Sequence, residues 1–164
     1  MNGLTFETSI PLLGIAARLG AACLCGFLVG FEREARDRPA GLRTHMLTAL
    51  AAALFGIIAI EMIAVFDTDD DSTQLDPIRV VEAVTAGVAF LAAGTIIQSR
   101  GNVRGLTTGA GMWLAGAIGL ACGTGLLTIA LIATVLAVII LAPLRMIESH
   151  IFDKSPPDYE NLDE

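Results

Sequence analysis

Residues 26–44 read GFLVGFEREARDRPAGLRT, and the rest of the chain is organised around this stretch. An apolar run ends at Phe31, and a dense group of charged side chains follows it: Glu32, Arg33, Glu34, Arg36, Asp37 and Arg38. Pro39-Ala40-Gly41 then breaks the chain before a second apolar run begins. We interpret the stretch as a short, arginine-rich loop between two hydrophobic helices.

The amino-acid composition indicates that the chain lies in a membrane. Of its 164 residues, 54% are hydrophobic and only 16% are charged. A soluble domain of this length needs more polar surface, so we predict an integral membrane protein whose main contact is the lipid bilayer. We find no basic stripe, and the formal charge of -7 would repel nucleic acid, so nucleic acid is not an expected partner.

Five apolar runs divide the chain, and each is near the ~20 residues that a helix needs to cross a bilayer. They cover residues 10–31, 44–65, 80–97, 106–121 and 125–144. They lack the alternation of barrel strands, so the sequence predicts an all-α bundle of five transmembrane helices over residues 10–144. Residues 1–9 precede the bundle, and residues 145–164 form a short polar tail.

The connectors between these runs predict the orientation of the chain. The first carries Arg33, Arg36, Arg38 and Arg43, and the third, residues 98–105, carries Arg100 and Arg104. The N-terminal segment and the fourth connector have no basic residue, and the second connector has one arginine among several aspartates. Basic loops stay in the cytoplasm, so we expect the N-terminus outside and the tail in the cytoplasm.

An offset of about 64 residues makes the chain partly match itself. Gly41-Leu42-Arg43-Thr44 aligns with Gly105-Leu106-Thr107-Thr108, and each turn precedes a helix rich in alanine and glycine. This predicts a parallel repeat of the first two helices by the third and fourth, unless glycine and alanine bias produces the match. With a true repeat, two helix N-termini would face one basic region, where an anion is favoured.

Four ordered motifs, GFLVGFERE, RPAGLRTHML, FLAAGTII and VRGLTTGAGMW, resemble the transmembrane domain of the MgtC/SapB family over about residues 10–144. The resemblance implies a bacterial inner-membrane protein associated with magnesium limitation and, in pathogens, with survival inside macrophages. It also implies a regulator without enzymatic activity, which in one branch acts on the proton-driven ATP synthase. Well-known members carry a C-terminal cytoplasmic domain, and we expect this sequence to lack it.

Most of the candidate functional residues lie on the predicted cytoplasmic side, and they are polar or charged. Part of this cluster is the ordinary signal for orientation, and part is a candidate site for an anionic ligand, a lipid headgroup or a partner protein. The candidate residues are Glu32, Arg33, Arg36, Arg43, Thr44, His45, Arg100, Asn102, Arg104, Thr107 and Thr108.

Three charged residues fall inside or near the ends of the apolar runs: Arg18, Glu61 and Glu82. Charges in a membrane are costly and often functional. We interpret them first as a structural ion pair between Arg18 and one of the carboxylates. A proton or cation path, or carboxylates that face water, are the alternatives.

The second connector is acidic, with Asp67, Asp69 and Asp71 close together. Such oxygen ligands suit Mg²⁺, so weak binding of Mg²⁺ is one interpretation, and a solvated acidic loop is the stronger one. No other cofactor is expected, because the sequence contains neither a phosphate-binding loop nor a histidine-rich metal motif.

Three hypotheses about function remain open. The first is a regulator linked to magnesium, without enzymatic activity, that acts on a membrane partner such as the ATP synthase. The second is a small Mg²⁺ or H⁺ transporter or channel. The third is a structural homo-oligomer assembled through the small-residue faces Gly26-xxx-Gly30, Gly105-xxx-Gly109 and Gly119-xxx-Gly123.

Overall fold

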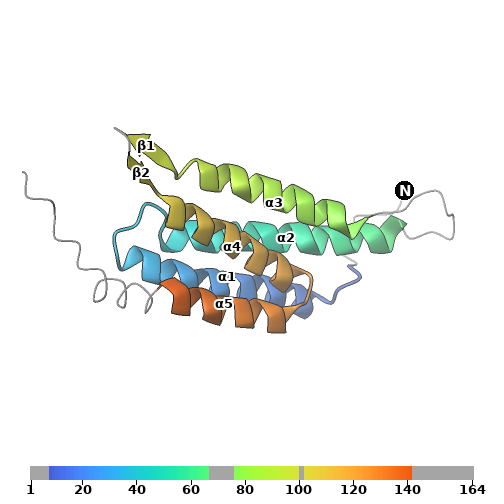
Figure 1. Cartoon of the computed structure of the whole chain (residues 1–164). Helices are drawn as coiled ribbons and strands as arrows, with labels where there is room; N and C mark the ends of the chain where they lie inside the picture. The colour runs from blue at the N-terminus through green and yellow to red at the C-terminus, as the bar shows by residue number, and fades with distance from the viewer. Residues whose placement is uncertain (1–7, 67–75, 100–101, 142–164) are drawn as a thin grey trace, which may run out of the picture.

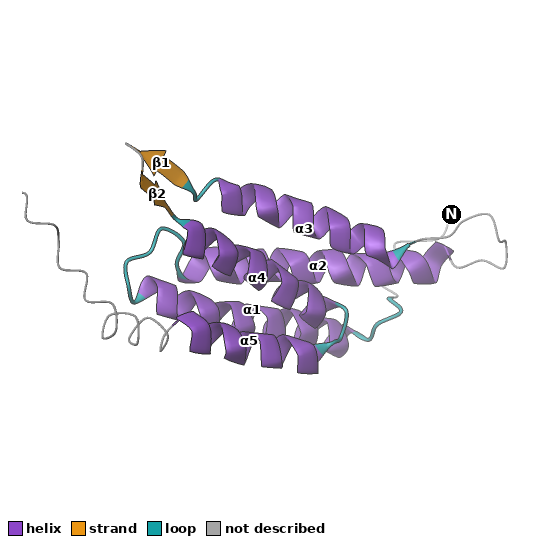
Figure 2. Cartoon of the chain, in the orientation of Figure 1, coloured by secondary structure: helices purple, strands orange, loops and turns teal. Residues whose placement is uncertain are grey.

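The computed structural model describes residues 8–66, 76–99 and 102–141. Helices dominate this part of the chain, with one short hairpin beside them (Figure 2). The elements are α1 (Leu12–Glu34), α2 (Leu42–Phe66), α3 (Pro77–Ala93), β1 (Ile97–Ser99), β2 (Asn102–Arg104), α4 (Leu106–Gly123) and α5 (Leu127–Leu141). The predicted all-α bundle of five helices is confirmed, and the hairpin is an addition that the sequence did not indicate.

The helices run back and forth along a common direction (Figure 1). Helices α2 and α4 lie in the middle, α3 lies along one edge, and α1 and α5 lie on the opposite side. The loop between α1 and α2 lies at the same end of the bundle as the hairpin between α3 and α4. The two connectors that the sequence predicts on one side of the membrane are therefore at one end of the molecule, which we call the basic end.

Three helices, α1, α2 and α4, are long and apolar enough to cross a membrane. Helix α5 is apolar but shorter over its described residues, and α3 has 17 residues that include Arg79 and Glu82. The chain is thus a membrane protein. Five crossings, the outside N-terminus and the cytoplasmic tail remain predictions.

The helix ends differ from the predicted runs at two functional places. Helix α1 continues through the charged residues to Glu34, so the expectation of a loop from residue 32 was wrong by about one turn. Helix α3 stops at Ala93 instead of near Ile97, where the hairpin begins. Gly105 then starts α4 with φ at 89°, and a side chain there would overlap the Thr95 carbonyl, so glycine is needed at this turn.

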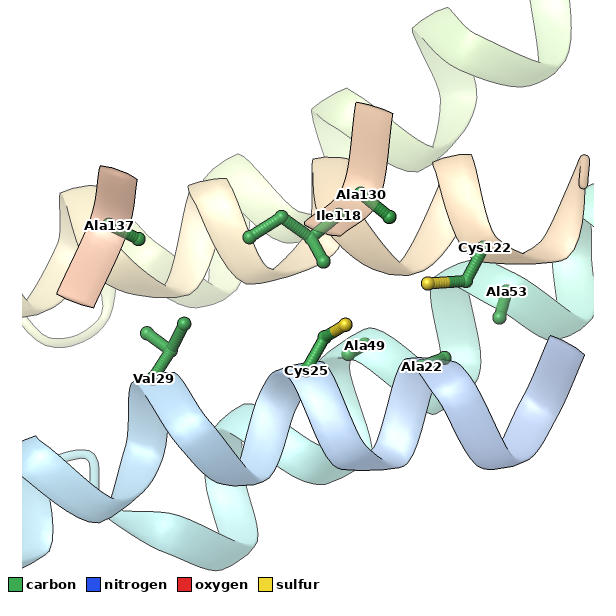
Figure 3. Close-up of a cluster of buried hydrophobic side chains, with 9 residues drawn as sticks. All are labelled: Ala22, Cys25, Val29, Ala49, Ala53, Ile118, Cys122, Ala130 and Ala137. Carbon is green, nitrogen blue, oxygen red and sulfur yellow. The ribbon is translucent and has the colours of Figure 1, made fainter. Parts of the chain in front are cut away.

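The core consists mainly of small side chains between α1, α2, α4 and α5, which let the helices approach closely. Cys25 and Cys122 point into the same space between α1 and α4 (Figure 3). The buried cluster comprises Ala22, Cys25, Val29, Ala49, Ala53, Ile118, Cys122, Ala130 and Ala137.

The glycine pairs bring helices of the same chain together. A side chain at Gly119 would overlap the backbone of Ala49, and one at Gly123 would overlap the backbone of Ala53. Gly26 and Gly30 pack in the same way against the start of α2, and Gly109 packs against the Ala92 carbonyl. Internal packing thus already uses these faces, and a homo-oligomer of the chain stays a prediction.

Candidate functional site

The basic end of the bundle is built around Arg33, which lies in the last turn of α1 and is only 4% exposed. Its Nη2 donates to the Oγ1 of Thr108 at 2.9 Å, and Thr108 is itself buried in the first turn of α4. The contact joins two residues that are 75 positions apart in sequence. It fixes the end of α1 against the start of α4.

Glu32 supplies the negative charge beside this contact. Its Oε1 lies 2.6 Å from the Nε of Arg36, and its Oε2 lies 3.8 Å from the Nη1 of Arg33. Glu32 is 8% exposed, so water screens this carboxylate poorly and the two guanidinium groups stabilise it. The structure therefore brings together four of the predicted site residues in one network of charges and hydrogen bonds.

His45 lies next to the network, fully buried in the first turns of α2. Its Nδ1 lies 2.9 Å from the Gly41 carbonyl, so this nitrogen carries a proton and donates it. Its Nε2 faces Gly111 of α4, where an added Cβ would come within 3.3 Å. The imidazole thus fills the space between α2 and α4 that a glycine leaves open.

The loop between α1 and α2 is anchored by residues that the sequence analysis did not single out as site residues. The Oε2 of Glu34 accepts a hydrogen bond from the Leu42 amide at 3.0 Å and so satisfies a free N–H at the start of α2. Ala40 is 2% exposed and packs with Ala92 and Met112. Glu34 lies eight positions before Leu42, and this spacing does not predict a hydrogen bond between the two residues.

The other predicted residues of this end lie outside the buried network. Arg43, Arg104 and Thr107 are exposed, and the Thr44 carbonyl accepts a hydrogen bond from Thr48. Arg100 lies outside the described residues, and Asn102 is placed only as the backbone partner of Ser99 in the hairpin. The basic end therefore has a buried, neutralised interior and an exposed rim that carries free guanidinium groups on Arg43 and Arg104. Binding of an anion here remains a prediction.

The expected ion pair between Arg18 and a carboxylate was wrong. The Nη1 of Arg18 donates to the Gly123 carbonyl at 2.9 Å, where the C-terminal end of α4 presents unpaired carbonyl groups and a partial negative charge. The carboxylate of Glu61 accepts from the backbone amides of Ser9 and Ile10 at 2.8 and 2.9 Å. Glu82 is exposed. Arg18 and Glu61 each bind a nearby part of the backbone instead.

The predicted weak magnesium ligands Asp67, Asp69 and Asp71 lie outside the described residues. Asp76, which follows them, caps α3 by accepting a hydrogen bond from the Ile78 amide at 2.9 Å. Within the part of the chain that the structure describes, no group of three histidine, cysteine or acidic side chains converges as metal ligands would.

Comparison with known proteins decides the family. A family-wide sequence profile, that of the MgtC family, matches residues 19–150. The chain belongs to the MgtC family. The residues matched include all of the basic end, from the last turns of α1 to the start of α4.

Curated relatives agree with this assignment. Protein MgtC of Brucella abortus (strain 2308) is 42% identical over 82% of this chain and 53% of its own length. A putative magnesium transporter of Escherichia coli (strain K12), YhiD, is 33% identical over 82% of this chain and 62% of its own. Protein SrpB of Synechococcus elongatus is 35% identical over 83% of this chain and 78% of its own. The chain thus spans about half the length of the first of these relatives. No solved structure matches it significantly.

Proposed function

We propose that this chain is a regulator without enzymatic activity in the bacterial inner membrane, where it serves adaptation to low magnesium through contact with a membrane partner. Membership of the MgtC family supports the location, and the name of the Escherichia coli relative supports the link to magnesium. The regulatory role rests on the packing of the bundle.

The observation that favours regulation over transport is the closed interior between α1, α2 and α4. Backbone atoms of α4 lie directly on α2 at Gly119 and Gly123, and the space between α1 and α4 is filled by alanine, valine, cysteine and isoleucine side chains. A path for Mg²⁺ needs oxygen ligands or water through the hydrocarbon region. The apolar side chains of this core provide neither.

The exposed rim of the basic end is the contact surface that we propose. Arg43 starts α2, Arg104 ends the hairpin, and both guanidinium groups are exposed. The buried contact between Arg33 and Thr108 joins the end of α1, which leads into α2, to the start of α4, which follows the hairpin. The rim is therefore presented rigidly. A partner with an acidic surface on the cytoplasmic side fits this rim, and the proton-driven ATP synthase is the partner that the family resemblance implies.

A growth experiment tests the regulatory role. In a bacterium that lacks its own family member, the full chain is expected to restore growth at limiting magnesium. The double variant Arg43→Gln/Arg104→Gln is expected to be inserted at wild-type level and to lose most of this effect. Arg43→Lys/Arg104→Lys, which keeps both positive charges at the rim, is the matched control and is expected to retain the effect. Full activity of the double variant would show that the rim is not the contact surface.

A flux experiment separates regulation from transport. The purified chain is placed in liposomes that contain a fluorescent indicator for Mg²⁺, and an inward magnesium gradient is applied. We expect the fluorescence to follow that of empty liposomes. Uptake of Mg²⁺ that depends on the protein would identify a transporter and contradict this proposal.

A further inference from the structure

Helix α3 packs less closely on α2 than α1 and α4 do. A groove with a cavity volume of about 540 Å³ runs between α2 and α3. Its walls are apolar along most of their length, with side chains such as Phe55, Ile58 and Val84, and Gly87 leaves the middle open. A Cβ added at Gly87 would meet no atom within 4 Å.

The dimensions of the groove fit an acyl chain. Its α3 wall extends from Arg79 to Leu91, a length of about 18 Å at 1.5 Å per residue. One leaflet of the hydrocarbon core measures about 15 Å, which is half of ~30 Å. The volume of about 540 Å³ is spread over that whole length, so the groove is long and narrow. A single extended apolar chain fits this shape.

A charged residue stands at one end of the groove. Arg79 lines this end, its side chain is exposed, and within the described residues no ion pair engages it. Glu82 lies three positions further along α3, on the same helix surface, and Asp76 lies three positions before Arg79. A phosphate group fits the guanidinium of Arg79, and an ammonium group fits the neighbouring carboxylate of Glu82.

We propose that the groove between α2 and α3 holds one phospholipid with a zwitterionic, ethanolamine-type headgroup. Its acyl chain fills the groove, its phosphate binds Arg79, and its ammonium group donates to Glu82. A headgroup with net negative charge is less favoured, because Asp76 and Glu82 together outweigh the one arginine. The headgroup would lie at the end of α2 that is opposite the regulatory rim, so its contacts with Arg79 and Glu82 are separate from those of Arg43 and Arg104.

Native mass spectrometry of the full chain tests the acyl part of the site. The purified protein is mixed in detergent with equal amounts of phosphatidylethanolamine and phosphatidylglycerol that carry the same acyl chains. The wild type is expected to retain one phosphatidylethanolamine. Gly87→Leu, which fills the groove, is expected to lose it. Gly20→Leu is the matched control, since Gly20 is also an exposed helical glycine with no atom near its added Cβ.

Two further variants test the headgroup part. Arg79→Gln is expected to weaken retention of both lipids by about tenfold, since a charged hydrogen bond to phosphate is lost. Glu82→Gln is expected to leave total lipid retention unchanged and to remove the preference for ethanolamine. Equal retention of both lipids by the wild type would contradict the assignment of the headgroup.

Two outcomes would overturn the whole site. One is equal lipid retention by Gly87→Leu and Gly20→Leu, which would place the lipid elsewhere. The other is a change in oligomeric state of Gly87→Leu with unchanged lipid, which would make the groove a surface for a second helix. Ala83→Leu, on the same wall of the groove, repeats the test if Gly87→Leu does not fold.

Discussion

The centre of the bundle and its α3 edge are made of similar residues but are packed very differently. Gly119 in α4 lies directly on the backbone of Ala49, whereas Gly87 in α3 has no atom within reach of an added Cβ. Both are glycines inside apolar helices. The difference shows that a glycine inside one of these helices lies either in a close contact between helices or on an open surface, and that the neighbouring helix decides which.

The charged residues of the basic end also divide into closely packed and exposed side chains. Arg33 and Glu32 are buried and hold the helices together, whereas Arg43 is exposed and free to meet a partner. The arginine that packs the helices and the arginine that we propose as a partner contact are therefore different residues, although only ten positions separate them. Substitutions at one buried and one exposed position test this difference.

The largest effect is expected for Gly119→Val compared with Gly87→Val. At position 119 the new side chain overlaps the Ala49 backbone, which cannot move aside, so we expect a loss of more than ~3 kcal/mol or failure to insert. At position 87 the side chain meets open space, and the change is expected to stay within about 1 kcal/mol. Unfolding of both purified variants in detergent provides the measurement, and equal losses would remove the distinction between centre and edge.

A smaller effect is expected for Arg33→Met compared with Arg43→Met. Methionine keeps much of the volume but leaves Glu32 with one guanidinium partner instead of two and Thr108 without its donor. We expect a loss of about 2 kcal/mol for Arg33→Met and at most ~0.5 kcal/mol for the exposed Arg43. Thermal unfolding in detergent measures both. A neutral Arg33→Met would show that the buried network does not hold the basic end together.

The smallest effect is expected for Arg18→Met, which removes one hydrogen bond to the Gly123 carbonyl and should cost about 1 kcal/mol. The effects of Arg18→Met and Glu61→Gln should be additive, because the two side chains contact different parts of the backbone. A double-mutant cycle of unfolding free energies measures the coupling. Strong coupling would indicate an ion pair between Arg18 and Glu61, as the sequence suggested, in place of the separate backbone contacts in the structure.

Much of the fold could be predicted because its signals are local. The apolar runs gave all five helices, since a bilayer requires a continuous apolar stretch, and the start of α4 at Leu106 was placed correctly. The hairpin after α3 was missed, because Ile96 and Ile97 extend the apolar run without marking the break at Gly94. The end of α1 was missed because Glu32 and Arg33 appear in the sequence as a solvated loop, and their partners lie on Arg36 and Thr108.

The candidate site could likewise be predicted only in part. Arg33 and Thr108 were placed in one cluster from their motifs, but the sequence could not show that Arg33 is buried, that Glu34 caps α2, or that Arg18 caps α4. Each of these contacts depends on where a second helix lies. No local propensity encodes that position.

Composition, periodicity and ordered motifs were enough to predict the membrane environment, the number of helices, the grouping of the basic connectors and the family. The packing of the helices, by contrast, sets which glycines are contacts, which arginines are exposed and where the groove beside α3 opens. The physical reason is that burial and pairing are properties of two surfaces together. A single chain segment specifies only one of the two.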